Sequence, residues 1–529
     1  LPFPTVAAIS GACLAEGFEI ALACSYRILS NDAQTCVGLP HVRLGVIPAF
    51  GTLGRLPKQL GLKRALELVL EGRILKPGEA VELQLVHELV APQALLEHAV
   101  KIALGAKKFK RPRASLHDGL LNRWGYLRKR LEAQTSARIK EHANGCLEAS
   151  RVAMESMFSS HEKHGVLHLD RDAKEFGRLA LANESKALLR IAQLKDSAKK
   201  LGSIAHKDVE HVNAVVLGAG NTGASIAAAL VASECGLILK DNKDSQLKRA
   251  LHQIKKHVAS IAGLNEAEKS FLLNRIEATT RDSANFGNTN FAIEAVQEDK
   301  TVKIIALNEL CESIPEESII ATSTSSFTIS SFTSSLKRPS RVIGMRFFFP
   351  AETHELVEIV MGEHSSDRAI AIASALACKM GKCPVIVHDK PGALVDRIMN
   401  PYFREAFLLL QEGYSISDID HCMQQFGFVM GPFRHLDVEG LDTAALWMDA
   451  IDIDEGTQAS NLNYPKQLTA LGRKGLKSGH GFYEYGRLGL RPSSDIREAL
   501  HLDGAEHPIG KEQKTITERL LLSLLNQAL

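Results

Sequence analysis

The stretch His211-Val-Asn-Ala-Val-Val-Leu-Gly-Ala-Gly-Asn-Thr-Gly223 decides the fold of the larger part of this chain. Its first half is an apolar run that is typical of a buried strand, and the pattern from Ala224 to Val231 indicates a helix directly after it. Strand and helix patterns then alternate to about residue 388. Such alternation predicts a parallel, doubly wound sheet with helices on both faces.

The turn after the first strand has the glycine spacing of a dinucleotide-binding loop, Gly218, Gly220 and Gly223, with Asn221 and Thr222 between them. The first glycine permits a tight turn, the second lets the backbone approach a pyrophosphate, and the third lets helix and strand pack closely. The helix that begins here presents free N–H groups to a phosphate. A glycine-rich turn without a ligand is the alternative, and the flanking strand and helix argue against it.

Acidic and hydroxyl side chains follow the next strands. Asp241 ends an apolar strand about 20 residues after the glycines, where a carboxylate accepts both ribose hydroxyls and repels a 2′-phosphate, so we expect NAD rather than NADP. Two later strand patterns lead to Glu298 and to Ser325. Because the carboxyl ends of parallel strands line the ligand crevice, we expect both residues near the cofactor or the substrate.

The composition excludes several classes of protein. The chain has 529 residues, which suggests three to four domains, with 45% apolar and 23% charged residues, so global disorder is excluded. A net charge of +2 gives no support for a nucleic-acid-binding protein. The nine cysteines form no CxxC pair and no zinc spacing, which indicates reduced thiols. No apolar run is long enough to predict a transmembrane helix.

Changes of pattern along the chain predict its organisation. The basic run at residues 107–113 predicts a solvated hinge, or else a surface for CoA phosphates or anionic lipid headgroups. An apolar helix at 515–529 needs a partner, which we expect to be the helices at 115–200 or a segment beyond residue 529. The predicted segments are 1–104 (mixed α/β), 105–208 (helical linker), 209–388 (doubly wound sheet), 389–486 (helical) and 487–529 (the start of a second helical domain).

Residues 211–486 resemble the L-3-hydroxyacyl-CoA dehydrogenases, and residues 1–95 resemble the later half of an enoyl-CoA hydratase, or crotonase, domain. The dehydrogenase motifs are Gly218–Gly223, Ile293-Glu-Ala-Val296, Thr324-Ser-Ser326, Gly344-Met-x-Phe-Phe348, Leu356-Val-Glu358, Pro391-Gly392, Met430-Gly-Pro432 and Lys477–Tyr483. The hydratase motifs are Val6–Gly11, Glu19, Gly38-Leu-Pro40, Leu44-Gly45 and Arg55-Leu-Pro57. In this order the two resemble the bifunctional fatty-acid β-oxidation proteins. Ser25–Ile28 and Glu184–Leu188 are most similar to the α-subunit of the mitochondrial trifunctional protein.

The resemblance implies an α/β plus α protein. It implies a partial crotonase-like domain, a helical linker, an NAD-binding Rossmann domain with a doubly wound sheet, and a helical C-terminal dehydrogenase domain, in a fragment lacking both ends. It also implies NAD as cofactor, acyl-CoA thioesters as substrates, a thiolase-type β-subunit as partner and peripheral association with a membrane. We expect a mitochondrial location, with the peroxisome as the alternative.

In the hydratase family two glutamates handle a water molecule, and the resemblance places the first at Glu19 and the second at the position of His41. Imidazole can exchange protons near neutral pH, but its reach differs from that of a carboxylate, so a loop residue without a catalytic role is the alternative. One of the two oxyanion N–H groups falls at Glu16, where a glycine is expected, and the other would precede residue 1. Losing one such donor typically costs about 10²–10³ in rate, so we expect no useful hydratase activity from this chain.

In the dehydrogenase family a histidine takes the hydroxyl proton and a glutamate orients it. Glu358 matches the glutamate, but the histidine position holds Arg346, which cannot act as a base, and we expect the two to form an ion pair. Asp396 stands where the family often has asparagine, whereas Ser325 is retained. His354 lies nearby in sequence and is an alternative base.

Two functions therefore remain open from the sequence. One is a hydratase and NAD-dependent dehydrogenase of fatty-acid β-oxidation with altered catalytic residues. The other is a pseudoenzyme that binds NAD or acyl-CoA, or that supports a thiolase-like partner.

Overall fold

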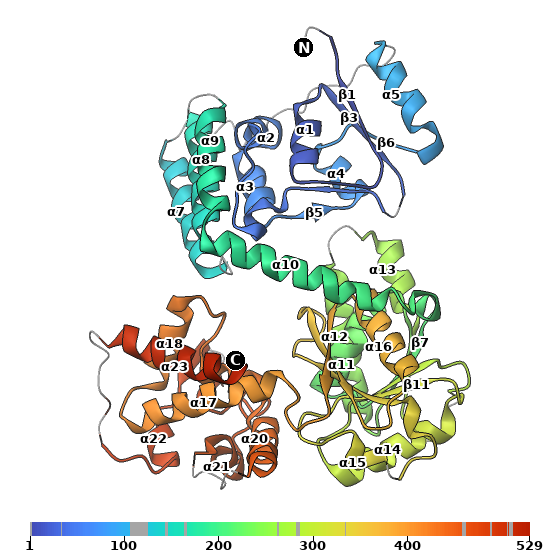
Figure 1. Cartoon of the computed structure of the whole chain (residues 1–529), viewed down its shortest axis with the longest axis vertical. Coiled ribbons are helices and arrows are strands. Elements are labelled where there is room, and N and C mark those ends of the chain that lie inside the picture. Colours follow the sequence, from blue (N-terminus) through green and yellow to red (C-terminus); the bar gives the residue numbers. More distant parts are fainter. Residues whose placement is uncertain are drawn as a thin grey trace. The chain divides into compact units, whose positions relative to one another are not determined.

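The apolar run after His211 forms strand β7 (Asn213–Leu217) inside an eight-stranded sheet of the computed structural model (Figure 1). The strand order is β14-β13-β12-β11-β10-β7-β8-β9, and neighbouring strands are parallel except for the antiparallel pair β12 and β13. The predicted doubly wound sheet is thus confirmed. The other strands are β8 (Gly236–Lys240), β9 (Ile276–Thr279), β10 (Phe291–Glu294), β11 (Ile319–Thr322), β12 (Val342–Phe347), β13 (Leu356–Met361) and β14 (Cys383–His388).

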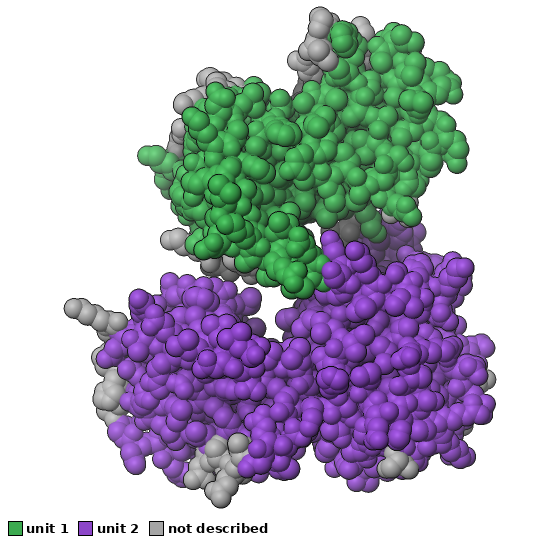
Figure 2. Space-filling view, in the orientation of Figure 1, with its two compact units in different colours: residues 1–194 green, residues 195–529 purple. Residues whose placement is uncertain are grey.

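The structure describes residues 3–32, 34–105, 125–142, 147–162, 167–261, 264–281, 286–333, 335–456, 462–486, 489–504, 506 and 512–529. The basic run at 107–113 lies outside these residues. The chain divides into two units, residues 1–194 and 195–529, which Figure 2 colours separately. Among the residues described, no helix combines the length and the apolar character that crossing a membrane would take.

Side chains of β7 alternate between two hydrophobic cores, one on each face of the sheet. Ala214 and Val216 share a core with residues of the helices α11, α12 and α16, whereas Val215 and Leu217 share a core with residues of α14. This alternation is the period of two that a strand buried on both faces requires. The helices of this part are α11 (Asn221–Ala232), α12 (Asp244–Ser260), α13 (Glu266–Leu273), α14 (Lys300–Ser313), α15 (Ser330–Thr333) and α16 (Asp367–Lys379).

The rest of this unit is mostly helical and has a core of its own. The helix at the end of the chain, α23, packs on α17 and α18 of this part, and its Ile516 and Leu520 belong to the same core. The sequence analysis did not name this partner, and a further partner beyond residue 529 stays a prediction. The elements are α17 (Val395–Gln411), α18 (Ile416–Phe426), α19 (Pro432–Glu439), α20 (Leu441–Glu455), α21 (Tyr464–Ala470), β15 (Tyr483–Gly486), β16 (Gly489–Pro492), α22 (Ile496–Ala499) and α23 (Gln513–Ala528).

The first unit contains two small sheets covered by helices. One has the parallel order β1-β3-β6, and the other has the order β2-β4-β5. The strands are β1 (Val6–Ile9), β2 (Ala12–Leu14), β3 (Tyr26–Ser30), β4 (Cys36–Gly38), β5 (Ile74–Leu75) and β6 (Glu88–Val90). The helices are α1 (Glu16–Ala23), the 3-10 helix at Pro40–Leu44, α2 (Thr52–Leu60), α3 (Leu62–Leu70), α4 (Pro77–Glu82) and α5 (Leu95–Ala103).

The segment that the sequence predicts as a linker is helical, but three of its helices belong to the core of the first unit. Helix α8 packs on α2 and α3, and its fully buried Met157 lies in one cluster with Leu56 and Leu66. Burial of this apolar face explains why these helices belong to the unit rather than standing apart from it. The helices are α7 (Gly125–His142), α8 (Leu147–Glu162), α9 (Leu169–Ala180) and α10 (Asn183–Gly202), which runs across the division at residue 194.

Candidate functional sites

The glycine-rich loop between β7 and α11 has the geometry that a dinucleotide requires. Gly218 has φ +99°, and a Cβ there would lie 2.4 Å from the carbonyl oxygen of Ala295. A Cβ on Gly223 would lie 1.9 Å from the carbonyl oxygen of Gly218, so both positions need glycine. A Cβ on Gly220 would meet nothing within 4 Å, which leaves open space beside the backbone.

The first turn of α11 has no side-chain cap at Gly220, so its N–H groups are free to face a phosphate. At the end of the neighbouring β8, Asp241 accepts hydrogen bonds from the backbone of Ala219 (2.8 Å) and Lys243 (2.9 Å). This ties the carboxylate to the glycine-rich loop. The residues present therefore fit NAD, with Asn221 and Thr222 in the first turn and Asp241 at the ribose position.

Glu298 lies beneath the loop that follows β11. One carboxylate oxygen, Oε1, accepts hydrogen bonds from the Thr324 hydroxyl (2.6 Å) and from the backbone of Ser325 (3.0 Å) and Ser326 (2.9 Å). The other, Oε2, lies 3.2 Å from Nζ of Lys303. Glu298 was predicted to bind the cofactor, and these contacts assign its carboxylate to holding the 324–326 loop in place.

Lys303, on α14, is a buried cation that the sequence analysis did not single out. Its Nζ also donates to both oxygens of Glu294, at 3.0 and 3.1 Å. Burial alone would lower the pKa of Lys303, but Glu294 and Glu298 raise it above its ordinary value. Burial alone would raise the pKa of Glu298, but the charge of Lys303 and the hydrogen bonds from the 324–326 loop lower it below its ordinary value. No sequence signal marked Lys303, because a lysine on a helix is usually exposed.

Arg346 is bound by two carboxylates at the end of the sheet. It is directly opposite Glu358 across the antiparallel pair β12 and β13, and Nη1 donates to Glu358 Oε2 at 3.1 Å, which confirms the predicted ion pair. Nη2 donates to Asp396 Oδ2 at 2.6 Å. The remaining oxygen of Glu358 accepts the backbone N–H groups of Leu394 (3.0 Å) and Val395 (2.8 Å) at the start of α17.

Gly392 joins Arg346 to Ser325. Its carbonyl oxygen accepts a hydrogen bond from Arg346 Nη1 at 3.0 Å, and its N–H donates to the Ser325 carbonyl at 2.9 Å. The guanidinium also lies 5.6 Å from the ring centroid of Phe348. Ser325, Arg346, Glu358 and Asp396 are thus brought together, and a guanidinium rather than an imidazole occupies the centre. His354 is exposed and is not among these contacts.

A further residue, Ser225 of α11, connects the cofactor helix to the loop after β12. Its buried hydroxyl accepts a hydrogen bond from the backbone of Ala351 at 2.6 Å and donates to the carboxylate of Glu352. No motif pointed to this serine, because its partners lie more than a hundred residues further along the chain.

In the first unit, Glu19 and His41 meet in the interior, where they are 1% and 2% exposed. His41 Nε2 lies 3.4 Å from Glu19 Oε1, and the Glu19 carboxylate accepts the backbone N–H groups of Ala49 (3.1 Å) and Phe50 (2.9 Å). Burial alone would raise the pKa of Glu19, but His41 and the Phe50 amide lower it below its ordinary value. Glu16 begins α1, and its half-exposed carboxylate lies 3.9 Å from His41 Nε2.

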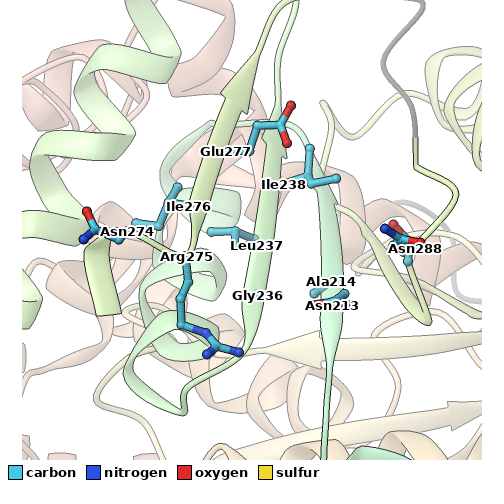
Figure 3. A pocket seen from close by; sticks show the side chains of 11 residues that line it. Asn213, Ala214, Gly236, Leu237, Ile238, Asn274, Arg275, Ile276, Glu277 and Asn288 are labelled. Atoms are coloured by element: carbon cyan, nitrogen blue, oxygen red, sulfur yellow. The ribbon is translucent and has the colours of Figure 1, made fainter. Parts of the chain in front are cut away.

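A cavity of about 320 Å³ opens elsewhere, at the amino ends of the strands (Figure 3). Its lining includes the first residues of β7 and β8, Asn213 and Gly236, and Arg275 just before β9. The glycine-rich loop and Arg346 lie at the carboxyl ends of their strands, the edge where open α/β sheets bind ligands. This cavity is therefore not part of the candidate sites.

The class of protein follows from the glycine-rich loop, the sheet and the helical domain after it: a dinucleotide-dependent dehydrogenase, joined here to a crotonase-like unit. Family models agree: enoyl-CoA hydratase/isomerase matches residues 1–144, the NAD-binding domain of 3-hydroxyacyl-CoA dehydrogenase matches 213–390, and its C-terminal domain matches 392–485. The chain belongs to the bifunctional enoyl-CoA hydratase and 3-hydroxyacyl-CoA dehydrogenase family of fatty-acid β-oxidation. NAD is the cofactor of this family's dehydrogenase domain, and acyl-CoA thioesters fit it as substrates.

Two curated relatives carry the description fatty acid oxidation complex subunit alpha. The protein from Shewanella amazonensis is 32% identical over all of this chain and 76% of its own length, and that from a Psychrobacter species is 34% identical over all of this chain and 75% of its own. Among solved structures, (S)-3-hydroxybutyryl-CoA dehydrogenase PaaH1 from Ralstonia eutropha is 30% identical, with a TM-score of 0.47 over 53% of this chain and 100% of its own. The 3-hydroxybutyryl-CoA dehydrogenase from Escherichia coli K12 is 28% identical, with the same TM-score of 0.47 over 52% and 60%.

Proposed function

We propose that the dehydrogenase half binds NAD and a 3-hydroxyacyl-CoA but oxidises the substrate slowly, because its site contains Arg346 in place of an imidazole. The observation that carries this proposal is the pair of contacts from the guanidinium to Glu358 and Asp396. A guanidinium has five donors, no acceptor lone pair and a pKa above about 12, so it cannot take the proton of a hydroxyl group. The guanidinium can still donate a hydrogen bond to the oxygen of a 3-keto group, so the site can still bind the acyl-CoA.

The test measures NADH formation from 3-hydroxybutyryl-CoA by the parent chain and by Arg346→His. A positioned base typically contributes about 10²–10⁴ in rate, so we expect the histidine variant to be faster by at least about tenfold, with little change in NAD affinity. Arg368→His makes the same replacement at an exposed position of the same unit and serves as the control. Equal rates for the parent and Arg346→His would refute the proposal.

For the hydratase half, we propose that Glu19 and His41 act as the acid–base pair. Support comes from the 3.4 Å separation of His41 Nε2 and Glu19 Oε1 and from the two backbone amides that fix the carboxylate. Crotonyl-CoA hydration by the parent should be weak, as expected from the sequence. It should fall further in His41→Ala and rise in His41→Glu, which restores a pair of carboxyl groups. Activity that is unchanged in His41→Ala would show that the imidazole is only a core residue.

A non-catalytic role is the second candidate, and the altered side chains in both sites favour it. Since the relatives named above are subunits of a complex, we propose that the chain also binds a thiolase-type β-subunit. Copurification of such a subunit with the double variant Arg346→Ala and His41→Ala would separate binding from catalysis. A mitochondrial location and a membrane-surface contact remain predictions of the resemblance, which fractionation of cells can test.

A further inference from the structure

Oxidation of a 3-hydroxyl group requires a proton acceptor as well as a hydride acceptor. If the dehydrogenase is slow, as proposed above, some group of this chain other than an imidazole takes the proton. Candidates must lie at the edge of the sheet that carries the glycine-rich loop, Ser325 and the end of β12, because the carboxyl ends of parallel strands bind the ligand.

Most acidic groups at this edge are already engaged. Glu358 accepts two backbone N–H groups on Oε1 and the guanidinium on Oε2. Glu298 is held by the 324–326 loop and by Lys303. A carboxylate that accepts this many hydrogen bonds is stabilised in its charged form and is a poor base.

Asp396 differs from both. It lies in the first turn of α17 and is 6% exposed. Its Oδ2 accepts the hydrogen bond from Arg346, whereas no group among the described residues donates a hydrogen bond to its Oδ1. Through Arg346 and Gly392 it is joined to Ser325 by three successive hydrogen bonds.

We propose that Asp396 is the proton acceptor of the dehydrogenase reaction in this chain, with Arg346 as the residue that positions its carboxylate. The O–H bond of the 3-hydroxyl breaks and its proton passes to Oδ1 of Asp396. The C3–H bond breaks with its electron pair leaving to NAD as hydride, and the C3–O bond becomes a carbonyl. Asp396 then returns the proton to solvent, and Arg346 holds the carboxylate throughout.

The surrounding charges make Asp396 a better base than an ordinary aspartate. Burial raises its pKa, Glu439 of α19 and Glu358 of β13 raise it further, and Arg346 of β12 opposes them. Glu439 itself accepts a hydrogen bond from Trp447 Nε1 at 2.9 Å, and burial raises its pKa as well, against the charges of Arg346 and Lys477. A base is most effective when its pKa approaches the working pH. The ion pair with Arg346 must weaken as the proton arrives, so we expect a lower rate than an imidazole base would give.

The experiment compares Asp396→Asn in two backgrounds, the parent and Arg346→His, with 3-hydroxybutyryl-CoA and NAD. In the parent background we expect kcat to fall by about 10²-fold, with the KM for NAD unchanged. In the Arg346→His background the imidazole takes the proton, so Asp396→Asn should be neutral or favourable. This reversal distinguishes a base from a structural residue, which would cause a loss in both backgrounds.

The pH profile gives a second readout. The rate of the parent should rise with pH as Asp396 loses its proton, and the Asp396→Asn profile should lack this limb. Asp454→Asn, which removes a carboxylate from the surface ion pair with Arg397, is the matched control. Calorimetric NAD binding shows that each variant is folded. If the parent forms NADH no faster than Asp396→Asn, the assignment of Asp396 as the base is wrong. If the parent and Arg346→His form NADH at equal rates, only the proposed slow dehydrogenase is wrong.

Discussion

Replacing Lys303 by methionine tests the buried charge network beneath the 324–326 loop. The lysine is fully buried, and its Nζ lies 3.0 and 3.1 Å from the two oxygens of Glu294 and 3.2 Å from Glu298. Methionine fills a similar volume but leaves both carboxylates without their cation. Removing one partner of a buried ion pair typically costs about 3–5 kcal/mol. Because the Glu294 side chain is 0% exposed and Glu298 only 13%, we expect a loss in this range.

Urea unfolding near neutral pH measures this loss, and NAD identifies the transition of the second unit, because a ligand stabilises only the unit that binds it. Lys300→Met, at the exposed start of the same helix, is the control and should change stability little. Adding Glu294→Gln to Lys303→Met removes one of the two stranded charges, so the double variant should recover part of the lost stability.

The stability lost in Lys303→Met should depend on pH in a defined direction. The pKa of Glu298 is lowered in the folded protein, so its contribution to stability is present above the ordinary carboxylate pKa and is lost as the pH falls through the lowered value. In Lys303→Met the carboxyls lose their cation, so the deficit relative to the parent should be greatest near neutral pH and shrink in acid. A deficit below about 1 kcal/mol, or one that does not change with pH, would refute the reasoning.

Three further substitutions test the NAD site. Gly218→Ala puts a Cβ 2.4 Å from a carbonyl oxygen at φ +99°, so thermal unfolding should show a loss of about 1–3 kcal/mol together with weaker NAD binding. Gly220→Ala meets nothing within 4 Å, so the melting temperature should stay unchanged while calorimetric titration shows weaker binding of NAD. The parent should bind NAD much more tightly than NADP, and Asp241→Asn should narrow this difference; equal affinities of the parent for both would contradict the role given to Asp241.

The sequence by itself determined the local parts of this protein. The run before Gly218 is a strand and the run after Gly223 is a helix, because periodicity and glycine spacing act over a few residues. The pairing of Arg346 with Glu358 was expected from the family resemblance. The antiparallel register of β12 and β13, which the sequence did not predict, places the two residues opposite each other.

Tertiary structure decided the contacts that join distant segments. Asp396 reaches Arg346 only because α17 begins beside the amino end of β13, where the Glu358 carboxylate accepts the N–H groups of Leu394 and Val395. Nothing in the sequence distinguishes Lys303 from other lysines on helices. Only the packing of α14 on the sheet buries it between two glutamates. The same holds for α23, whose apolar face has many chemically equivalent partners. The fit of the side chains selects α17 among them, and the periodicity of the sequence cannot identify that partner.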